Sequence, residues 1–254
     1  MNRTMWHAFD ILADHLHVPE SLRQTAVPEM ARLVYGERIV RWFSDKSADG
    51  PWPADVDLRP GMVLSRTVGK DDLRLRIEQS WPQTVPCVLE LDLVCEAQGL
   101  HTVRSWNARE VIGSEDQPSP LVATTERGTW ERGVLSRRHV GGRNEIAHQR
   151  RVGGSLSIYG FMGRFPLDAW PMNSQQADEY ELLYERMLEL GPVRLRQLPQ
   201  GPVYDRPAAA GLKGYELRPE RGFPLEFWVN GRGAVIYLVE AATRAWVLES
   251  VEAV

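Results

Sequence analysis

The chain has only two cysteines, Cys87 and Cys95, among its 254 residues, and only six histidines. The two cysteines are eight residues apart on one predicted strand, beyond the reach of a disulfide, so we expect free thiols. Among the histidines only His15 and His17 are closely spaced, and residues two apart on a helix face different directions. A metal site needs several ligands on one side, so the sequence predicts none.

The chain also lacks long apolar runs and an excess of charge of either sign. No stretch approaches the roughly 20 apolar residues of a membrane-spanning helix, and the start of the chain has no basic region followed by an apolar one. We therefore expect a cytoplasmic protein. The net charge of −4 provides no global attraction for a nucleic acid. Two basic clusters, at 137–139 and 143–151, are interpreted as a solvated hairpin face.

Motifs that specify a reaction or a cofactor are missing too. The glycine pairs at 141–142 and 153–154 do not match a phosphate loop that opens a helix, so they are predicted to be turns. The stretch 153–157 reads Gly-Gly-Ser-Leu-Ser and lacks the last glycine of a serine nucleophile elbow. We expect no cofactor, and the sequence favours a protein that is not an enzyme.

Alternation of apolar and polar residues is what the sequence does contain. It is clear at 73–78 and 89–93, where every second residue is leucine or isoleucine, as in a strand with one buried face. Similar runs recur over 62–162 and 214–251, separated by breaks too short for crossover helices. The sequence therefore predicts a single domain over 1–254 of α+β class that is mostly β. Its sheet is a curved antiparallel meander, a half-barrel or open barrel.

The individual elements follow from these patterns. The predicted strands are 62–68, 72–80, 86–96, 100–112, 121–127, 130–139, 144–151, 155–162, 214–218, 224–229, 234–240 and 244–251. Helical spacing of apolar residues predicts a helical prefix within 1–45, with helices at 5–17 and 19–34. A further helix over 173–191, with Tyr180, Leu183, Tyr184 and Met187 on its apolar stripe, is expected to pack on the sheet and to end at Gly191.

The nine tryptophans suggest where a ligand could bind. Large aromatic side chains either fill a core or line a cavity that a curved sheet encloses. Polar residues occupy both alternating phases of 100–112 and 144–151, so one wall of such a cavity would be polar. The candidate ligand-binding residues are Arg104, Trp106, Trp130, His148, Arg150, Tyr159 and Phe161, with the cations near a polar head group.

Two local phrases carry a resemblance to a known group of proteins. They are Glu-Arg-Gly-Thr-Trp-Glu-Arg-Gly at 126–133 and Pro-Leu-Glu-Phe-Trp-Val-Asn-Gly-Arg-Gly at 224–233. With the predicted architecture over 62–251, they resemble curved half-barrel proteins that bind lipids, such as bacterial lipoprotein-localisation proteins and a glycolipid-binding family. The resemblance implies a non-catalytic fold with an apolar interior and no cofactor.

Three functions remain open at this level. The leading hypothesis is a cytoplasmic, non-catalytic protein that binds an apolar or amphipathic, lipid-like molecule inside the curved sheet. The second is a structural or interaction protein with a solid core and a protein partner. The third is a hydrolase that uses a pair formed by a histidine and a carboxylate across strands. Its histidine candidates are His101, His139 and His148, and its carboxylate candidates are Glu90, Asp92, Glu110 and Glu145.

Overall fold

The computed structural model describes residues 12, 15–43, 52–81, 86–113, 122–169, 180–183, 189–198, 211–241 and 243–254. Its strands are β1 (Met30–Phe43), β2 (Trp52–Val68), β3 (Asp72–Trp81), β4 (Cys87–Glu96), β5 (Val103–Ile112), β6 (Val122–Glu131), β7 (Val134–Gly141), β8 (Asn144–Arg151), β9 (Gly154–Ser157), β10 (Tyr180–Leu183), β11 (Glu189–Gln197), β12 (Lys213–Pro219), β13 (Leu225–Val229), β14 (Val235–Glu240) and β15 (Arg244–Ala253). Its helical elements are α2 (Glu20–Arg23), α3 (Ile158–Gly163) and the 3-10 turn η1 (Leu167–Ala169).

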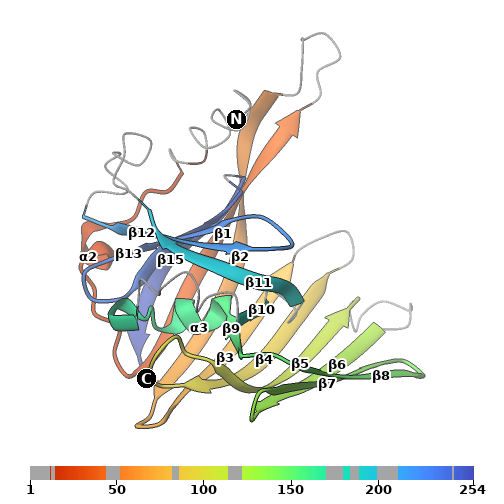
Figure 1. The fold of residues 1–254 in the computed structure, drawn as a ribbon. Coiled ribbons are helices and arrows are strands. Elements are labelled where there is room, and N and C mark those ends of the chain that lie inside the picture. The colour runs from red at the N-terminus through yellow and green to blue at the C-terminus, as the bar shows by residue number, and fades with distance from the viewer. Residues whose placement is uncertain are drawn as a thin grey trace.

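All 15 strands belong to one open sheet, whose order is β8 to β1 followed by β15 to β9. Neighbouring strands are antiparallel except β9 and β10, which are parallel. The part formed by β3 to β8 curves away from the part formed by β9 to β15, and α3 lies between them (Figure 1). Within the described ranges no helix is long and apolar enough to cross a membrane. The predicted mostly β, curved antiparallel fold is confirmed.

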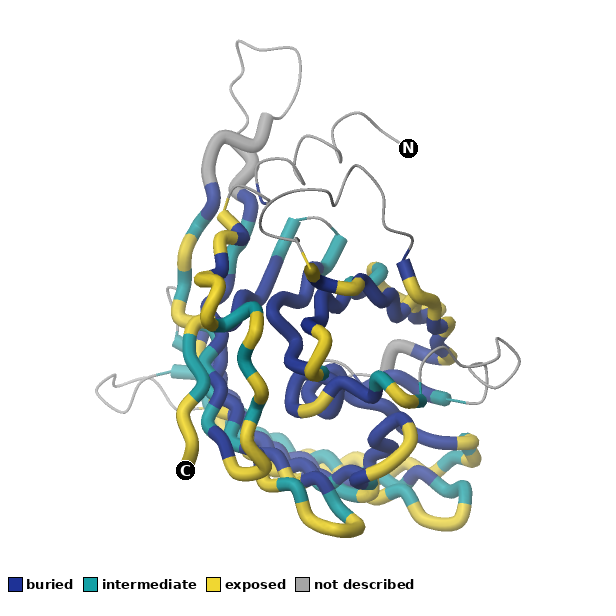
Figure 2. The backbone as a smooth tube through the Cα atoms, turned by 90° about the vertical axis from the view of Figure 1, so that its left-hand side faces the viewer, coloured by how far each residue is buried: buried dark blue, intermediate teal, exposed yellow. Residues whose placement is uncertain are grey.

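Burial follows the alternation that the sequence shows. Along β3 and β4 every second residue is buried, and the buried set includes Cys87 and Cys95 together with the leucines between them. Both cysteines are free thiols, as expected. Figure 2 shows buried residues concentrated toward the centre of the molecule and exposed ones at the hairpin turns of its rim.

The helix predicted over 19–34 is wrong, apart from the short α2. Strand β1 begins at Met30 and pairs with both β2 and β15. Ala31, Leu33 and Tyr35 are buried at a spacing of two, as in a strand. The apolar residues of 19–34 therefore fit both a strand and a helix where they overlap this run. The strand forms because β1 pairs with a neighbour on each side, and a local sequence pattern does not show such pairing. The predicted helix at 5–17 falls largely outside the described residues.

The helix predicted over 173–191 is also wrong where the structure describes it. Tyr180 to Leu183 form β10 and pair with β9, and β11 begins at Glu189. Glu181, which does not belong to the predicted apolar stripe, is buried. Its neighbours Leu182 and Leu183 are fully buried as well, so this segment lacks the one-sided pattern of a surface helix. The candidates Tyr184 and Met187 lie outside the described residues.

Two smaller corrections concern the end of one predicted strand and the position of one turn. The predicted strand at 155–162 is a strand only up to Ser157, after which α3 begins with the Ser157 hydroxyl accepting a hydrogen bond from the Tyr159 N–H. The break between the predicted strands 121–127 and 130–139 is not present, and the turn lies at Arg132 and Gly133 instead. Gly128 lies inside β6 opposite Trp106. Glycine is needed at this position because a Cβ atom would come within 2.0 Å of the Trp106 ring.

Helix α3 fills the centre of the curved sheet. The Phe161 ring lies 5.7 Å from that of Phe227 and 5.9 Å from that of Phe165, and Phe165 lies 4.6 Å from Tyr215. The Tyr35 hydroxyl donates toward the backbone carbonyls of α3 and β14, so this group is satisfied although it is buried. The interior around α3 is therefore a packed aromatic core.

We expect Leu183→Ala to lower the free energy of unfolding by about 2–5 kcal/mol, because the side chain is fully buried beside β9 and its removal leaves a cavity. Urea titration measures the change. Leu58→Ala is the matched control, since Leu58 is 60% exposed and its truncation should cost less than about 0.5 kcal/mol. Equal effects of the two substitutions would contradict the placement of β10 in the core.

We expect Cys87 and Cys95 to react slowly with a thiol reagent at neutral pH in the folded protein and rapidly in urea. Both side chains are buried, and burial raises the pKa of the Cys95 thiol, so little thiolate is available. Mass spectrometry of the labelled protein counts the modified thiols. Rapid labelling of either cysteine without denaturant would show that β4 is not packed as described.

Candidate functional site

Four of the sequence-predicted ligand residues lie near one another on the face of the sheet that carries the core. Trp106, Gly128, Arg137 and His148 stand directly opposite one another across β5, β6, β7 and β8, so they share this face. In an adjacent row Trp130 lies opposite Leu135, which lies opposite Arg150. The structure thus brings Trp106, Trp130, His148 and Arg150 to one region of the sheet.

A buried carboxylate, Glu126, organises part of this region. It accepts hydrogen bonds from the Trp106 indole N–H at 2.8 Å and from Arg137 Nε at 2.7 Å, and His139 Nδ1 lies 3.5 Å away. A histidine and a carboxylate therefore meet across strands, although not with the carboxylates expected for a hydrolase. Because Arg137 and Trp106 already satisfy Glu126, the pair resembles a structural network more than a poised general base.

The other predicted residues have different surroundings. Arg104 is about half exposed and lies 3.7 Å from Glu96. Tyr159 and Phe161 are fully buried in α3, where the Tyr159 hydroxyl contacts Gln79 at 3.2 Å. Trp130 and Arg150 bridge the seam where β8 leads into β9: the Trp130 indole donates to the Val152 carbonyl, and Arg150 lies 2.6 Å from Glu181.

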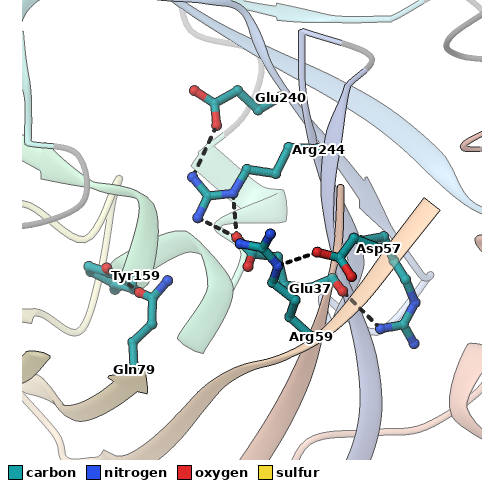
Figure 3. A network of polar contacts seen from close by, with 8 residues as sticks. Glu37, Asp57, Arg59, Gln79, Tyr159, Glu240 and Arg244 are labelled. Atoms are coloured by element: carbon teal, nitrogen blue, oxygen red, sulfur yellow. Dashed lines mark hydrogen bonds and ion pairs between the residues drawn. The ribbon is translucent and has the colours of Figure 1, made fainter. Parts of the chain in front are cut away.

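A second polar network crosses the core-facing side of β1, β2 and β15, and its side chains point toward one another in Figure 3. Glu37 is buried and accepts from Arg244 Nε at 2.6 Å, and Arg244 Nη1 lies 3.6 Å from Glu240. The Arg244 guanidinium also stacks over Trp246, 4.1 Å from the ring centroid. The carboxylates of Glu37 and Glu240 thus lie within ion-pair distance of the same guanidinium group.

Charge balance holds for all four buried glutamates of the described chain. Each lies within ion-pair distance of an arginine; the pairs are Glu37 with Arg244, Glu126 with Arg137, Glu181 with Arg150, and Glu216 with Arg196. A buried charge without a partner is costly, so such pairing is expected. Among the described residues Arg66 is the one arginine that is buried, and it differs from these pairs.

Arg66 is 8% exposed and donates to backbone carbonyls rather than to a carboxylate. Its Nε donates to the Pro28 carbonyl at 2.8 Å, and its Nη atoms donate to the carbonyls of Val27, Pro28 and Gly163. Burial and the nearby charge of Arg164 lower the pKa of Arg66 to about 10. Arg66 nevertheless remains charged at neutral pH, and no carboxylate of the described chain forms an ion pair with it.

Arg66 lines a cleft of about 690 Å³ at one end of the curved sheet. The end of β2, the β4–β5 connection, the segment after α3 and the β13–β14 turn all contribute to it. Its charged residues are Arg66, Arg164, Arg232, Glu29 and Asp168, and its apolar side chains include Val27, Val68, Phe165 and Leu167. Three guanidinium groups against two exposed carboxylates give the cleft a net positive charge.

His101 lines the same cleft, and its side chain is almost completely buried. It is 3% exposed and has a φ of 55°, a left-handed conformation that is uncommon for residues other than glycine. Its Nδ1 lies 3.0 Å from the Glu96 carbonyl, which can only accept, so Nδ1 carries the hydrogen. Nε2 has no partner in the described structure and presents a lone pair. Burial, with Arg164 and Arg66 nearby, lowers the pKa of His101 and favours this neutral form.

No pattern in the sequence points to Arg66 or Arg164, and His101 is suggested only as a hydrolase candidate. These three residues lie on separate elements and follow no spacing motif. The one local signal was the glycine at 99, which indicated a turn but not its chemistry. Among the described residues no group of three histidines, cysteines or carboxylates is placed to hold a metal ion.

Comparison with known proteins supports the fold. No protein-family model and no curated protein matches the chain. Among solved structures it is similar to a β-barrel-like protein of a domain of unknown function, DUF1849, from Brucella abortus, with a TM-score of 0.50 and 10% sequence identity. The match covers 91% of this chain and 100% of the other. At this identity the likeness shows a β-barrel-like fold and nothing further about function.

We expect the free energy of unfolding to fall as the pH drops below about 6.5, because unfolded His101 takes up a proton there while folded His101, whose pKa is lowered, does not. The contribution is at most about 1.4 kcal/mol per pH unit. His101→Asn should remove it, and asparagine tolerates the left-handed backbone. Urea titrations of both proteins near pH 7.5 and 5.5 compare the losses. An equal loss in the two proteins would contradict a neutral buried His101.

Proposed function

We propose that this protein is a non-catalytic binding protein that takes a small, anionic, amphipathic molecule into the cleft at Arg66, His101 and Arg164. One observation carries the proposal. Every buried glutamate of the described chain has an arginine partner, whereas the buried Arg66 forms no ion pair with a described residue and lines the cleft together with Arg164, whose charge affects the pKa of Arg66 more than that of Glu29 does. An anionic ligand would supply the missing charge.

The chemistry of the cleft indicates which anion fits. Arg164 is exposed, and its side chain makes no hydrogen bond or ion pair with a described residue, so its N–H groups are available to anionic oxygens. His101 Nε2 presents a lone pair and therefore suits a hydroxyl or a protonated oxygen. A phosphate monoester has both kinds of oxygen in its monoanionic form, which predominates below its second pKa of about 6.

The apolar lining of the cleft supports an amphipathic ligand rather than a free anion. Phe165 and Leu167 follow α3 directly, and Val68 ends β2, so apolar side chains flank the two arginines. Burial of an alkyl chain contributes roughly 0.8 kcal/mol per methylene group. This proposal keeps the lipid-like ligand suggested by the sequence but moves it from the centre of the sheet, which α3 fills, to the end of the sheet.

We expect dodecyl phosphate to bind saturably in isothermal titration calorimetry, and Arg164→Gln to weaken the binding at least about tenfold, as loss of a hydrogen bond to a charged group should. Arg104→Gln is the matched control. It removes the same charge from a half-exposed position outside the cleft, and it is also the head-group residue that the sequence suggested. Its affinity should stay within about twofold of the wild type.

Two further ligands separate the contribution of the anionic head group to the affinity from that of the alkyl chain. Dodecanol lacks the charge and inorganic phosphate lacks the chain, and we expect both to bind more weakly than dodecyl phosphate. Absence of saturable binding to dodecyl phosphate would contradict the proposal. So would an equal loss of affinity in Arg104→Gln and Arg164→Gln, because it would show a diffuse electrostatic effect rather than a site in the cleft.

A further inference from the structure

Strand β8 is an exposed edge of the sheet. It is the last strand in the sheet order, and in the described part of the chain it pairs with β7 alone. Seven of its eight residues are exposed, and Arg150 is intermediate. The strand lies at the outer rim of the curved sheet (Figure 1). A regular strand of this length with open backbone groups is a template for another strand.

The hairpin that joins β7 to β8 determines which backbone groups are open. Gly141 stands opposite Asn144 across a two-residue turn, so these two residues form a hydrogen-bonded pair. Hydrogen-bonded pairs alternate along an antiparallel ladder, so the even-numbered residues of β8 bond to β7. The N–H and C=O groups of Glu145, Ala147, Gln149 and Arg151 therefore point away from the sheet, toward the open edge.

We propose that β8 pairs in antiparallel fashion with β8 of a second copy of this chain, which continues the sheet across a two-fold axis. In the register that the charges favour, Glu145 lies opposite Arg151 of the second copy, and Ala147 lies opposite Gln149 of the second copy. Residues with open backbone groups then face each other along the whole strand. The symmetry repeats each contact, so two pairs between Glu145 and Arg151 form.

The charges on β8 explain why a second copy fits this edge. Arg151 is exposed and forms no ion pair with a described residue. Glu145 lies 2.8 Å from Arg138 and is half exposed, so its carboxylate can accept from a further guanidinium. A register shifted by one pair would place Ala147 opposite itself and Arg143 opposite Arg151, which repel each other. The strand is thus complementary to itself in one register.

Sedimentation velocity over about three decades of concentration tests the proposal. We expect a reversible dimer that weakens with salt. Arg151→Glu should raise the dissociation constant at least about tenfold, since two attractive cross-strand pairs become repulsive. The double variant with Glu145→Arg and Arg151→Glu exchanges the charges and should restore dimerisation. Arg127→Glu, the same change at an exposed position of β6 two strands away, is the control and should have little effect.

A second variant tests the backbone pairing itself. Ala147→Pro removes an N–H that points to the open edge, so β8 can remain paired with β7 while the dimer is lost. Far-UV circular dichroism checks that the fold is retained. A wild-type protein that stays monomeric throughout the concentration range would overturn the proposal and leave the edge open to a different chain. A dimer that withstands both Ala147→Pro and Arg151→Glu would place the interface elsewhere.

Discussion

The pairing of β1 with β15 is the interaction on which the rest of the fold depends. It runs from Ala31 opposite Ala253 to Ile39 opposite Arg244, and β2 covers the other edge of β1. This ladder joins the strands that precede α3 to those that follow it. Beside the irregularity at Tyr35, the tyrosine hydroxyl reaches the carbonyls of Met162 and Val235 and ties the ladder to α3 and β14.

The sequence predicted the strands in which buried and exposed residues alternate. It did not predict the strands that form because of pairing with strands far away in the sequence. β3 and β4 each have one buried face and one exposed face, so the alternation of apolar and polar residues can be recognised within the strand itself. β1 and β10 are specified by neighbours far along the chain, and their apolar residues fit a helical spacing equally well. The site was hidden for the same reason. Arg66, His101 and Arg164 meet only after β2, the β4–β5 connection and α3 come together.

Charge balance connects the packing of the protein with its proposed function. Each buried glutamate of the described chain has its charge compensated by an arginine, as in the Glu126 and Glu37 networks. The cleft differs because Arg66 donates its hydrogen bonds to backbone carbonyls. These carbonyls satisfy its N–H groups but do not neutralise its positive charge. The cost of that buried charge falls when an anion enters, so ligand binding and stability should rise together.

A titration of isotope-labelled protein with dodecyl phosphate, followed by backbone amide NMR, tests the central claim most directly. The account predicts saturable shifts at the residues that line the cleft, namely Gly99, His101, Arg164, Phe165, Leu167 and Gly233, with little change along the exposed face of β3 and β4. Saturable shifts confined to the region of Trp106, Arg137 and His148 would contradict it, because the ligand would then occupy the β5–β8 part of the sheet and not the cleft.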